Sequence, residues 1–254
     1  MGSGRIVNLK FTTHFFETLP STQSLAREWA EQRLYSSGDI IVAATQTGGY
    51  GRRGRTWESP SGNLFATLIV DPPSHDALNW MGFVTSLALY DVAKAYVPTP
   101  QELCIKWPND LMVDGKKLAG ILLEVAGEVL LVGIGVNLVV APHTDQQTVC
   151  LAPNKALTPE VFLYKFFPRF SHWYEQAQSK GFGAVREAWL QRSFLKPQQE
   201  ITARIADGRV LVGKFLDLDT TGALVLQASD KTHTITAADI FISHDHERQQ
   251  TSAR

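Results

Sequence analysis

Cysteine is scarce in this sequence of 254 residues, with only Cys104 and Cys150 present. The two do not have metal-ligand spacing, and two cysteines do not make a disulfide scaffold. Their scarcity favours a reducing, cytoplasmic compartment. The sequence also lacks an excess of either charge, because 24 Lys and Arg residues stand against 25 Asp and Glu residues. A nearly neutral chain is a poor candidate for a protein that coats duplex nucleic acid.

Long uninterrupted apolar runs are absent as well. The N-terminal segment MGSGRIVNLKF lacks the apolar core of a signal peptide. The most apolar stretch, residues 121–140, contains Glu124, Glu128 and a central glycine, so it predicts a β-hairpin and not a membrane span. With 44% hydrophobic and 19% charged residues, the composition is that of a soluble globular protein with a sizeable core.

The first part of the chain mixes predicted strands with predicted helices. Strands are expected at 11–19, 38–45 and 63–70, and in four segments within 102–140. Helices are expected at 21–34, at 78–97 and within 158–193, where Pro168 predicts a kink or a break. The elements do not alternate as regular β–α–β units. The fold class is therefore α+β around a mixed, mostly antiparallel sheet.

The pattern changes after residue 195. The segment that follows contains four or five short strands separated by the turns DG, DTTG and ASDKT. This predicts a small β-barrel. The sequence thus divides into a domain at 1–195, a barrel at 196–246 and a polar tail at 247–254.

The segment GGYGRRGRTW, residues 48–57, nearly matches two nucleotide-binding patterns. One is the dinucleotide fingerprint G-x-G-x-x-G, and the other is a Walker loop with Arg in place of Lys. Both patterns need a helix directly after the loop, because the helix N-terminus holds the phosphate. The residues that follow are ESPSG and then a predicted strand, so neither pattern applies. The loop must hold a ligand by itself.

Arg52, Arg53 and Arg55 make this loop a candidate anion site. Glycine permits backbone conformations that turn N–H groups toward one point, and guanidinium groups bind phosphate through two hydrogen bonds. We expect the like charges of these arginines to repel one another in the empty loop. The loop should therefore be mobile without a ligand and ordered when a ligand is bound. The alternative is a solvated, charged turn.

The segment CIKWPNDLMVDGKKLAGILLE, residues 104–124, is the second unusual stretch. Lys106 ends an apolar strand before a tight turn, where it could neutralise a phosphate. Asn109 and Asp110 could orient a ligand, bind Mg²⁺ or simply cap the turn. Lys117 could contact phosphate or be a solvated hairpin lysine, and Gly120 would allow close approach to the strand backbone.

A third polar group surrounds the start of the first helix. Ser21, Thr22 and Gln23 can supply donors to a polar ligand, although plain helix capping explains them equally. Gln46 lies at the end of a predicted strand, beside the glycine-rich loop.

Taken together, these stretches resemble the biotin–protein ligases. The loop GGYGRRGRTW is similar to the family's GRGRRGRxW element, and KWPNDL matches the family signature without a change. The elements GKKLAGILLE, GIGVNL and PSTQS follow the family's order and spacing. The resemblance covers roughly residues 12–245, and the combination of motifs is highly specific.

The resemblance implies a catalytic domain related to class II aminoacyl-tRNA synthetases, followed by a C-terminal SH3-like barrel. It also implies the monofunctional type of ligase, because the PSTQS element at residue 21 leaves no room for an N-terminal winged helix. We therefore expect no binding to operator DNA. A homodimer formed through an edge strand is left open by the sequence.

The implied reaction has two steps. ATP and biotin give biotinyl-5′-AMP and pyrophosphate, with Mg²⁺ offsetting the triphosphate charge. The biotinyl group then passes to a lysine of a biotin carboxyl carrier protein, such as a subunit of acetyl-CoA carboxylase.

The resemblance also assigns roles to individual residues. The catalytic residues it implies are Arg52, Lys106 and Lys117. Biotin and biotinyl-AMP would be bound by Ser21, Thr22, Gln23, Gln46, Tyr50, Gly51, Arg52 and Lys106. Supporting residues would be Gly49, Trp57, Asn109, Asp110, Gly120 and Asn137, and no metal ligand is assigned. Tyr50 departs from the family, which has an arginine there, and this puts the retention of the intermediate in doubt.

Two alternatives compete with this interpretation. A lipoate ligase or octanoyl transferase shares the core fold but lacks KWPND and the arginine-rich loop. A non-enzymatic nucleic-acid module would combine an arginine loop with a small barrel, but the neutral charge and the lack of aromatic and basic interleaving argue against it. ATP–pyrophosphate exchange, measured with biotin and with lipoate, distinguishes a biotin ligase from a lipoate ligase. Salt-sensitive binding of nucleic acid would support the nucleic-acid module.

Overall fold

The computed structural model describes residues 9–72, 77–99, 102–152, 157–205, 207–229 and 231–242. Its larger sheet has seven strands in the order β1-β2-β3-β7-β6-β5-β4. Their bounds are β1 Thr12–Leu19, β2 Asp39–Gln46, β3 Leu64–Val70, β4 Leu103–Lys106, β5 Asp110–Val113, β6 Lys116–Ala126 and β7 Val129–Val136. The β1–β2 pair is parallel and the other neighbours are antiparallel. The prediction of a mixed, mostly antiparallel sheet is confirmed.

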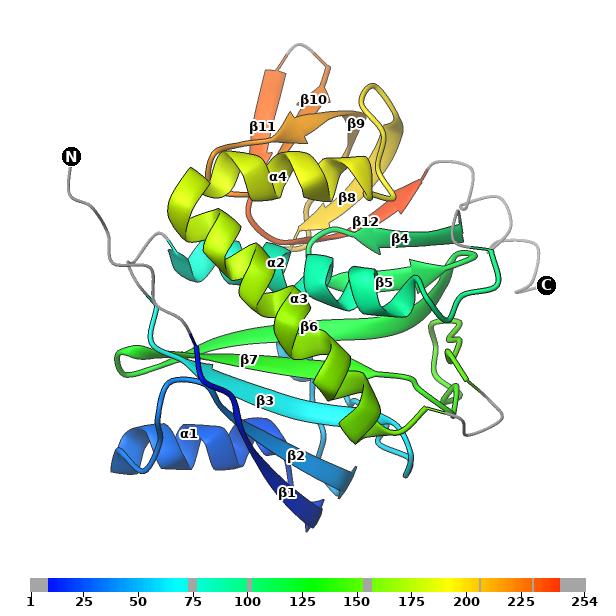
Figure 1. Cartoon of the computed structure of the whole chain (residues 1–254). Coiled ribbons are helices and arrows are strands. Elements are labelled where there is room, and N and C mark those ends of the chain that lie inside the picture. Colours follow the sequence, from blue (N-terminus) through cyan, green and yellow to red (C-terminus); the bar gives the residue numbers. More distant parts are fainter. Residues whose placement is uncertain are drawn as a thin grey trace.

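Helices cover both faces of this sheet (Figure 1). Helix α1, Thr22–Gln32, packs on one face, where Ala26 meets Ile41 and Leu131 in a small apolar cluster. The other face carries the main core, which includes apolar residues of α2, α3 and α4. These helices span Ala77–Ala93, Pro159–Lys180 and Phe182–Gln191. Alternate residues of each strand therefore face two different layers.

Of the two outcomes predicted for Pro168, the break is wrong, because α3 continues through this proline from Pro159 to Lys180, whereas the kink stays a prediction. The chain turns instead at Gly181, whose φ of 76° joins α3 directly to α4. Glycine adopts this left-handed region at little cost, whereas a side chain would be strained there. The sequence signal for the helix boundary was thus the glycine and not the proline.

The C-terminal part is a second, five-stranded antiparallel sheet in the order β11-β10-β9-β8-β12. Its strands are β8 Glu200–Ile205, β9 Val210–Leu218, β10 Leu224–Ala228, β11 Lys231–Ile235 and β12 Ala238–Ile242. The predicted strand content is confirmed. The sheet is consistent with an SH3-like domain, but within the described residues it does not close into a barrel, because β11 and β12 remain its edges.

The two sheets share apolar contacts and a hydrogen bond. The indole N–H of Trp107 donates to the carbonyl of Gly222 over 3.1 Å. A Cβ on Gly222 would lie 2.5 Å from the ring of Phe83, so the C-terminal turn packs closely against α2. The domain boundary at residue 195 stays a prediction, and the predicted tail at 247–254 lies outside the described residues. In the described part of the chain, none of the helices combines the length and the apolar character needed to cross a membrane.

Candidate functional site

A row of paired residues crosses four strands on the face of the sheet that also carries α1. Lys106 pairs with Asp110, Asp110 with Gly120, and Gly120 with Gly135. Residues paired in register lie on the same face of a sheet, and neighbouring strands are about 4.8 Å apart, so this row spans roughly 14 Å. The row connects the KWPND turn at one end to a pair of glycines at the other.

Trp57 lies directly over this glycine pair. A Cβ built on Gly135 would come within 2.4 Å of the indole, and one on Gly120 within 2.9 Å. The ammonium of Lys117 lies 5.3 Å from the indole centroid, on the same side of the sheet. The sequence predicted that a ligand would approach the strand backbone closely at Gly120. In the structure the side chain of Trp57 makes this close approach. The two glycines are required because no other residue leaves room for the indole.

Replacing Gly135 by alanine should therefore displace Trp57 and destabilise the fold. Overpacking of this kind costs about 1–3 kcal/mol. We expect a lower urea midpoint by circular dichroism, together with a change in tryptophan fluorescence. Gly183→Ala is the control, because it lies in helix α4 with nothing within 4 Å of a built Cβ. Alanine there should stabilise the helix by about 0.5–1 kcal/mol. Equal stability of both variants would contradict the assigned role of Gly135.

Polar residues of α1 form a buried hydrogen-bonded group beside Trp57. The hydroxyl of Ser21 caps α1 by accepting from the backbone N–H of Gln23 over 3.2 Å. The side-chain oxygen of Gln46 accepts from the backbone N–H and hydroxyl of Thr22, at 2.8 and 3.2 Å. Thr67 contributes a hydroxyl 3.0 Å from the side-chain oxygen of Gln23. The capping interpretation of Ser21 is confirmed, and the predicted residues Ser21, Thr22, Gln23 and Gln46 are brought together.

Two N–H donors in this region are buried and lack a hydrogen-bond partner among the described residues. They are Nε2 of Gln23 and Nε1 of Trp57. The side chain of Gln23 lies over Gly133, and that of Trp57 over Gly135, two residues further along the same face of β7. Buried polar groups are normally satisfied, so two such donors over one strand face mark a place where a ligand with acceptor atoms would fit.

The arginine loop forms a small hairpin between β2 and β3. Tyr50 bridges to Thr56, the N–H of Gly51 donates to the carbonyl of Arg55, and the N–H of Trp57 donates to the carbonyl of Gly49. A single 3₁₀ turn, Arg52–Gly54, stands at its tip. The strand β3 follows, so rejecting both nucleotide fingerprints was correct. A Cβ on Gly49 would come within 2.7 Å of the Trp57 carbonyl, which explains this glycine.

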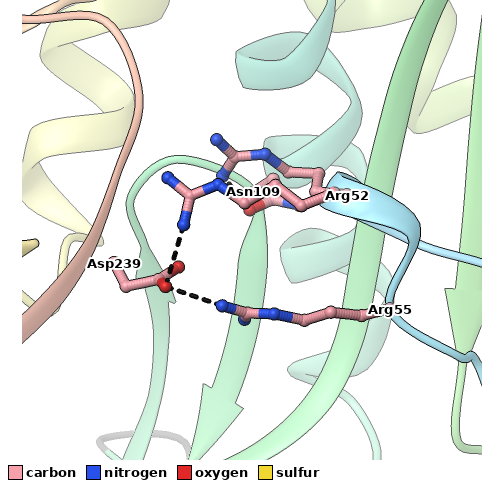
Figure 2. Close-up of polar contacts among 5 residues, drawn as sticks. Arg52, Arg55, Asn109 and Asp239 are labelled. Carbon is pink, nitrogen blue, oxygen red and sulfur yellow. Dashed lines mark hydrogen bonds and ion pairs between the residues drawn. The ribbon is translucent and has the colours of Figure 1, made fainter. Parts of the chain in front are cut away.

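Arg52 points toward the KWPND turn. Its guanidinium donates to Oδ1 of Asn109 over 3.2 Å. Figure 2 labels both residues beside the loop. Burial and the neighbouring charge of Arg53 lower the pKa of Arg52 from its usual value, although Asp110 and Asp239 oppose this. The amide of Asn109 donates to the carbonyl of Ile121 over 2.6 Å, which fixes the turn against β6. Arg52 is thus half-buried over the sheet.

The two predicted lysines, Lys117 and Lys106, lie in different surroundings. The ammonium of Lys117 lies 2.8 Å from Oδ1 of Asp110. The ammonium of Lys106 lies 6.0 Å from the ring centroid of Phe194 and 5.7 Å from that of Phe241 on β12. Lys106 is therefore half-buried between the two sheets, at the far end of the four-strand row. Asn137 supports Lys117, because its side chain donates to the Lys117 carbonyl over 3.3 Å.

Three contact residues of the loop were missed by sequence reasoning. The hydroxyl of Tyr50 donates to Oε2 of Glu124 over 3.2 Å, and Arg27 of α1 lies 3.1 Å from the same oxygen. Burial, followed by the charge of Glu124, raises the pKa of Tyr50. Arg53 and Arg55 both contact Asp239 of β12. Glu124 ends the GKKLAGILLE element, but nothing in that element indicated a contact with Tyr50. Arg27 and Asp239 belong to no motif, so no sequence signal pointed to them.

Two family models match this chain. That of the biotin/lipoate A/B protein ligase family matches residues 15–140, and that of the biotin protein ligase C terminal domain matches residues 199–243. A biotin–[acetyl-CoA-carboxylase] ligase of Paracoccus denitrificans is 37% identical over 215 residues, which cover 79% of this chain and 89% of the relative. The chain belongs to the biotin protein ligase family. The resemblance found in the sequence is confirmed.

Further similarities agree with this membership. A biotin–[acetyl-CoA-carboxylase] ligase of Mycobacterium tuberculosis is 29% identical over 80% of this chain and 78% of the relative. The biotin protein ligase of Aquifex aeolicus in complex with biotin and ATP has a TM-score of 0.78, covering 91% of this chain and 99% of that one. At 23% identity, this neighbour shows the same fold. The predicted fold class is confirmed, and the rival interpretations as a lipoate ligase and as a nucleic-acid module are not supported.

Proposed function

We propose that this member of the biotin protein ligase family is an ATP-dependent ligase that attaches biotin to a carrier protein. In the first step, a carboxylate oxygen of biotin attacks the α-phosphorus of ATP, and the bond to pyrophosphate breaks. In the second step, a lysine amine of the carrier attacks the carbonyl carbon of biotinyl-5′-AMP. An amide forms, AMP leaves with the bonding electron pair, and the amine proton is released.

The four-strand row from Gly135 to Lys106 is the observation that carries this proposal. Trp57 covers the glycine end of this row, so the row sets a span of roughly 14 Å between the indole and Lys106, a length suited to a ligand with a heterocycle at one end and a phosphate at the other. At the glycine end, Gln23 and Trp57 hold unsatisfied buried donors that suit the acceptor atoms of a biotin ring. At the other end, Lys106 and Arg52 supply positive charge for the carboxylate and phosphate oxygens.

Each predicted residue receives a role consistent with its position. Ser21, Thr22, Gln23 and Gln46 bind the biotin end through a fixed hydrogen-bonded group. Arg52, on the loop, covers the mixed anhydride and holds it. Lys106 stabilises the charge that develops on the reacting oxygens, and Lys117 steadies phosphate during the first step. Tyr50 and Gly51 shape the loop that covers the ligand.

Mg²⁺ belongs to this proposal as the partner of the nucleotide. Among the described residues, no three His, Cys, Asp or Glu side chains gather into a metal site. Mg²⁺ bound to a triphosphate needs only one or two carboxylates, and it takes its other ligands from phosphate and water. The chain therefore suits a metal ion that enters with ATP, and no protein ligand is assigned to it.

The acceptor in this proposal is a biotin carboxyl carrier domain, in the cytoplasm where such carriers and ATP occur together. The C-terminal sheet has open edges, and the ion pair of Arg55 with Asp239 brings one of them, β12, beside the arginine loop. A carrier lysine could thus approach the anhydride between the two sheets.

Pyrophosphate exchange tests the proposed substrate. The purified chain should exchange labelled pyrophosphate into ATP when biotin is present. Lipoate at the same concentration should support no more than background exchange. Exchange that depends on lipoate and not on biotin would assign the chain to the other branch of the family, and exchange with neither would contradict the proposed first step.

A further inference from the structure

The carboxylate of Asp239 connects the C-terminal sheet to the arginine loop (Figure 2). Its Oδ2 atom accepts from Nη1 of Arg53 over 3.1 Å and from Nη2 of Arg55 over 2.7 Å. Asp239 lies on β12, an edge strand of the C-terminal sheet, and is 184 residues beyond Arg55 in the chain. A single oxygen atom thus joins two arginines of the loop to a different sheet.

The backbone conformation of the loop directs its arginine side chains toward two different partners. Arg53 has φ 59° and ψ 27°, a left-handed conformation that is uncommon for a residue with a side chain. At this turn the chain sends Arg52 inward to Asn109, whereas Arg53 and Arg55 reach outward to Asp239. Such a conformation persists only where its surroundings hold it, and the shared carboxylate supplies that restraint.

The carboxylate of Asp239 offsets part of the repulsion among the loop arginines. Three guanidinium groups within four residues repel one another, as the sequence indicated. Burial tends to raise the pKa of Asp239, but the hydrogen bond and charge of Arg55, with the charges of Arg53 and Arg52, lower it overall. Because the folded-state pKa is depressed, the contact contributes fully once the pH is clearly above the ordinary pKa of an aspartate, and it is lost as the pH falls through the lowered pKa.

We propose that Asp239 is a positioning residue that holds the arginine loop against the C-terminal sheet. This contact holds the outer side of the loop while Arg52 remains over the site. Once the intermediate has formed, the same contact keeps Arg52 in place over the mixed anhydride. This second part rests on the proposed function, whereas the first does not.

Limited proteolysis of the ligand-free protein tests the first part. Trypsin cuts after arginine, and Asp239→Asn leaves every arginine of the loop in place, so a change in cutting reports a change in loop opening. Two partly exposed ion pairs on one carboxylate should contribute about a three- to tenfold effect. Cleavage within residues 48–57, identified by mass spectrometry, should therefore be about three- to tenfold faster in this variant.

Two further variants separate the contact from general damage to the sheet. Asp207→Asn removes another aspartate of the C-terminal sheet that binds an arginine, Arg209 in its own turn, over 2.7 Å. It should leave loop cleavage unchanged, whereas Asp239→Glu keeps the charge and should stay within about twofold of the unmodified protein. Unchanged cleavage in Asp239→Asn, or equal acceleration in all three variants, would overturn the proposal.

Release of biotinyl-AMP tests the second part. Asp239→Asn should release the intermediate about three- to tenfold faster, while its single-turnover rate of adenylate formation changes less than about twofold. A residue that only stabilised the fold would lower both rates together. Equal release from Asp239→Asn and the unmodified protein would contradict the role in retention. Absence of adenylate from the unmodified protein would instead contradict the proposed function, and the proteolysis result would stand.

Discussion

Replacing Lys106 by alanine should lower the rate of biotinyl-AMP formation at least about 100-fold. Lys106 ends a short strand of the central sheet, and its neighbours Trp107 and Ile105 are buried, so its position is fixed before any ligand arrives. A charge that is already in place stabilises the transition state without reorganisation. The effect should fall on the rate constant of adenylation in single-turnover measurements, and it should persist at saturating biotin and ATP.

Lys116→Ala is the matched control for this experiment. Lys116 lies at the start of β6 and is 4.0 Å from Asp114 of the adjoining turn, in a pair that is largely exposed. Its removal should change adenylation by less than about twofold, because exposed ion pairs contribute little. A Lys106→Ala protein that is folded by circular dichroism and forms adenylate at the normal rate would show that Lys106 does not act on the first step.

Replacing Arg52 by glycine should also have a large effect. It should shorten the time for which biotinyl-AMP stays bound and leave the rate of its formation largely unchanged. The guanidinium stands on a loop, so it acts by covering the intermediate more than by lowering the barrier. Loss of a charge-assisted, two-hydrogen-bond contact costs roughly 1.5–3 kcal/mol. The intermediate should then dissociate about 10- to 150-fold faster, and released biotinyl-AMP should label surface lysines of bystander proteins.

Two companions sharpen the Arg52 experiment. Arg52→Lys keeps the charge but not the planar fork, and it should leak to an intermediate extent. Arg209→Gly removes an exposed arginine whose ion pair with Asp207 lies within its own turn, and it should not leak. Slow adenylation by Arg52→Gly with no labelling of bystanders would mean that the roles of Arg52 and Lys106 have been exchanged.

Much of the site could be predicted from the sequence because its motifs are local. The KWPND turn follows an apolar strand, so the place of Lys106 at a strand end was evident from a few neighbouring residues. Ser21 before a run of helix formers predicted a cap, and the structure has that cap. Gly120 predicted a close approach to the strand backbone, although the sequence could not indicate that Trp57 would make it.

Contacts between distant segments were beyond prediction from one sequence. Asp239 meets Arg55 across 184 residues, and Tyr50 meets Glu124 across 74. The local sequence predicts repulsion among these arginines in an empty loop, because their partner carboxylate lies in the distant C-terminal segment. The break predicted as one outcome at Pro168 does not occur, for a related reason. Tertiary packing of α3 against the main core keeps the helix continuous through a residue that disfavours it locally.

The orientation of Tyr50 changes the meaning of its departure from the family pattern. The side chain does not point at Arg52 but binds Glu124, which also binds Arg27 of α1. The loop is thus attached at both sides through carboxylates, Glu124 at the start and Asp239 near the end. Where the family has an arginine, Tyr50 thus attaches the loop to Glu124 of β6. In the proposed function, this attachment would favour retention by fixing the loop and not by adding charge.

Transfer of labelled biotin to a carrier domain tests the central claim most directly. The chain would be incubated with radiolabelled biotin, Mg²⁺ and a purified biotin carboxyl carrier domain, with and without ATP, and with a carrier whose acceptor lysine is replaced by arginine. The account predicts label on the intact carrier only when ATP is present, and none on the arginine carrier. Label that appears without ATP, or that reaches both carriers equally, would contradict it.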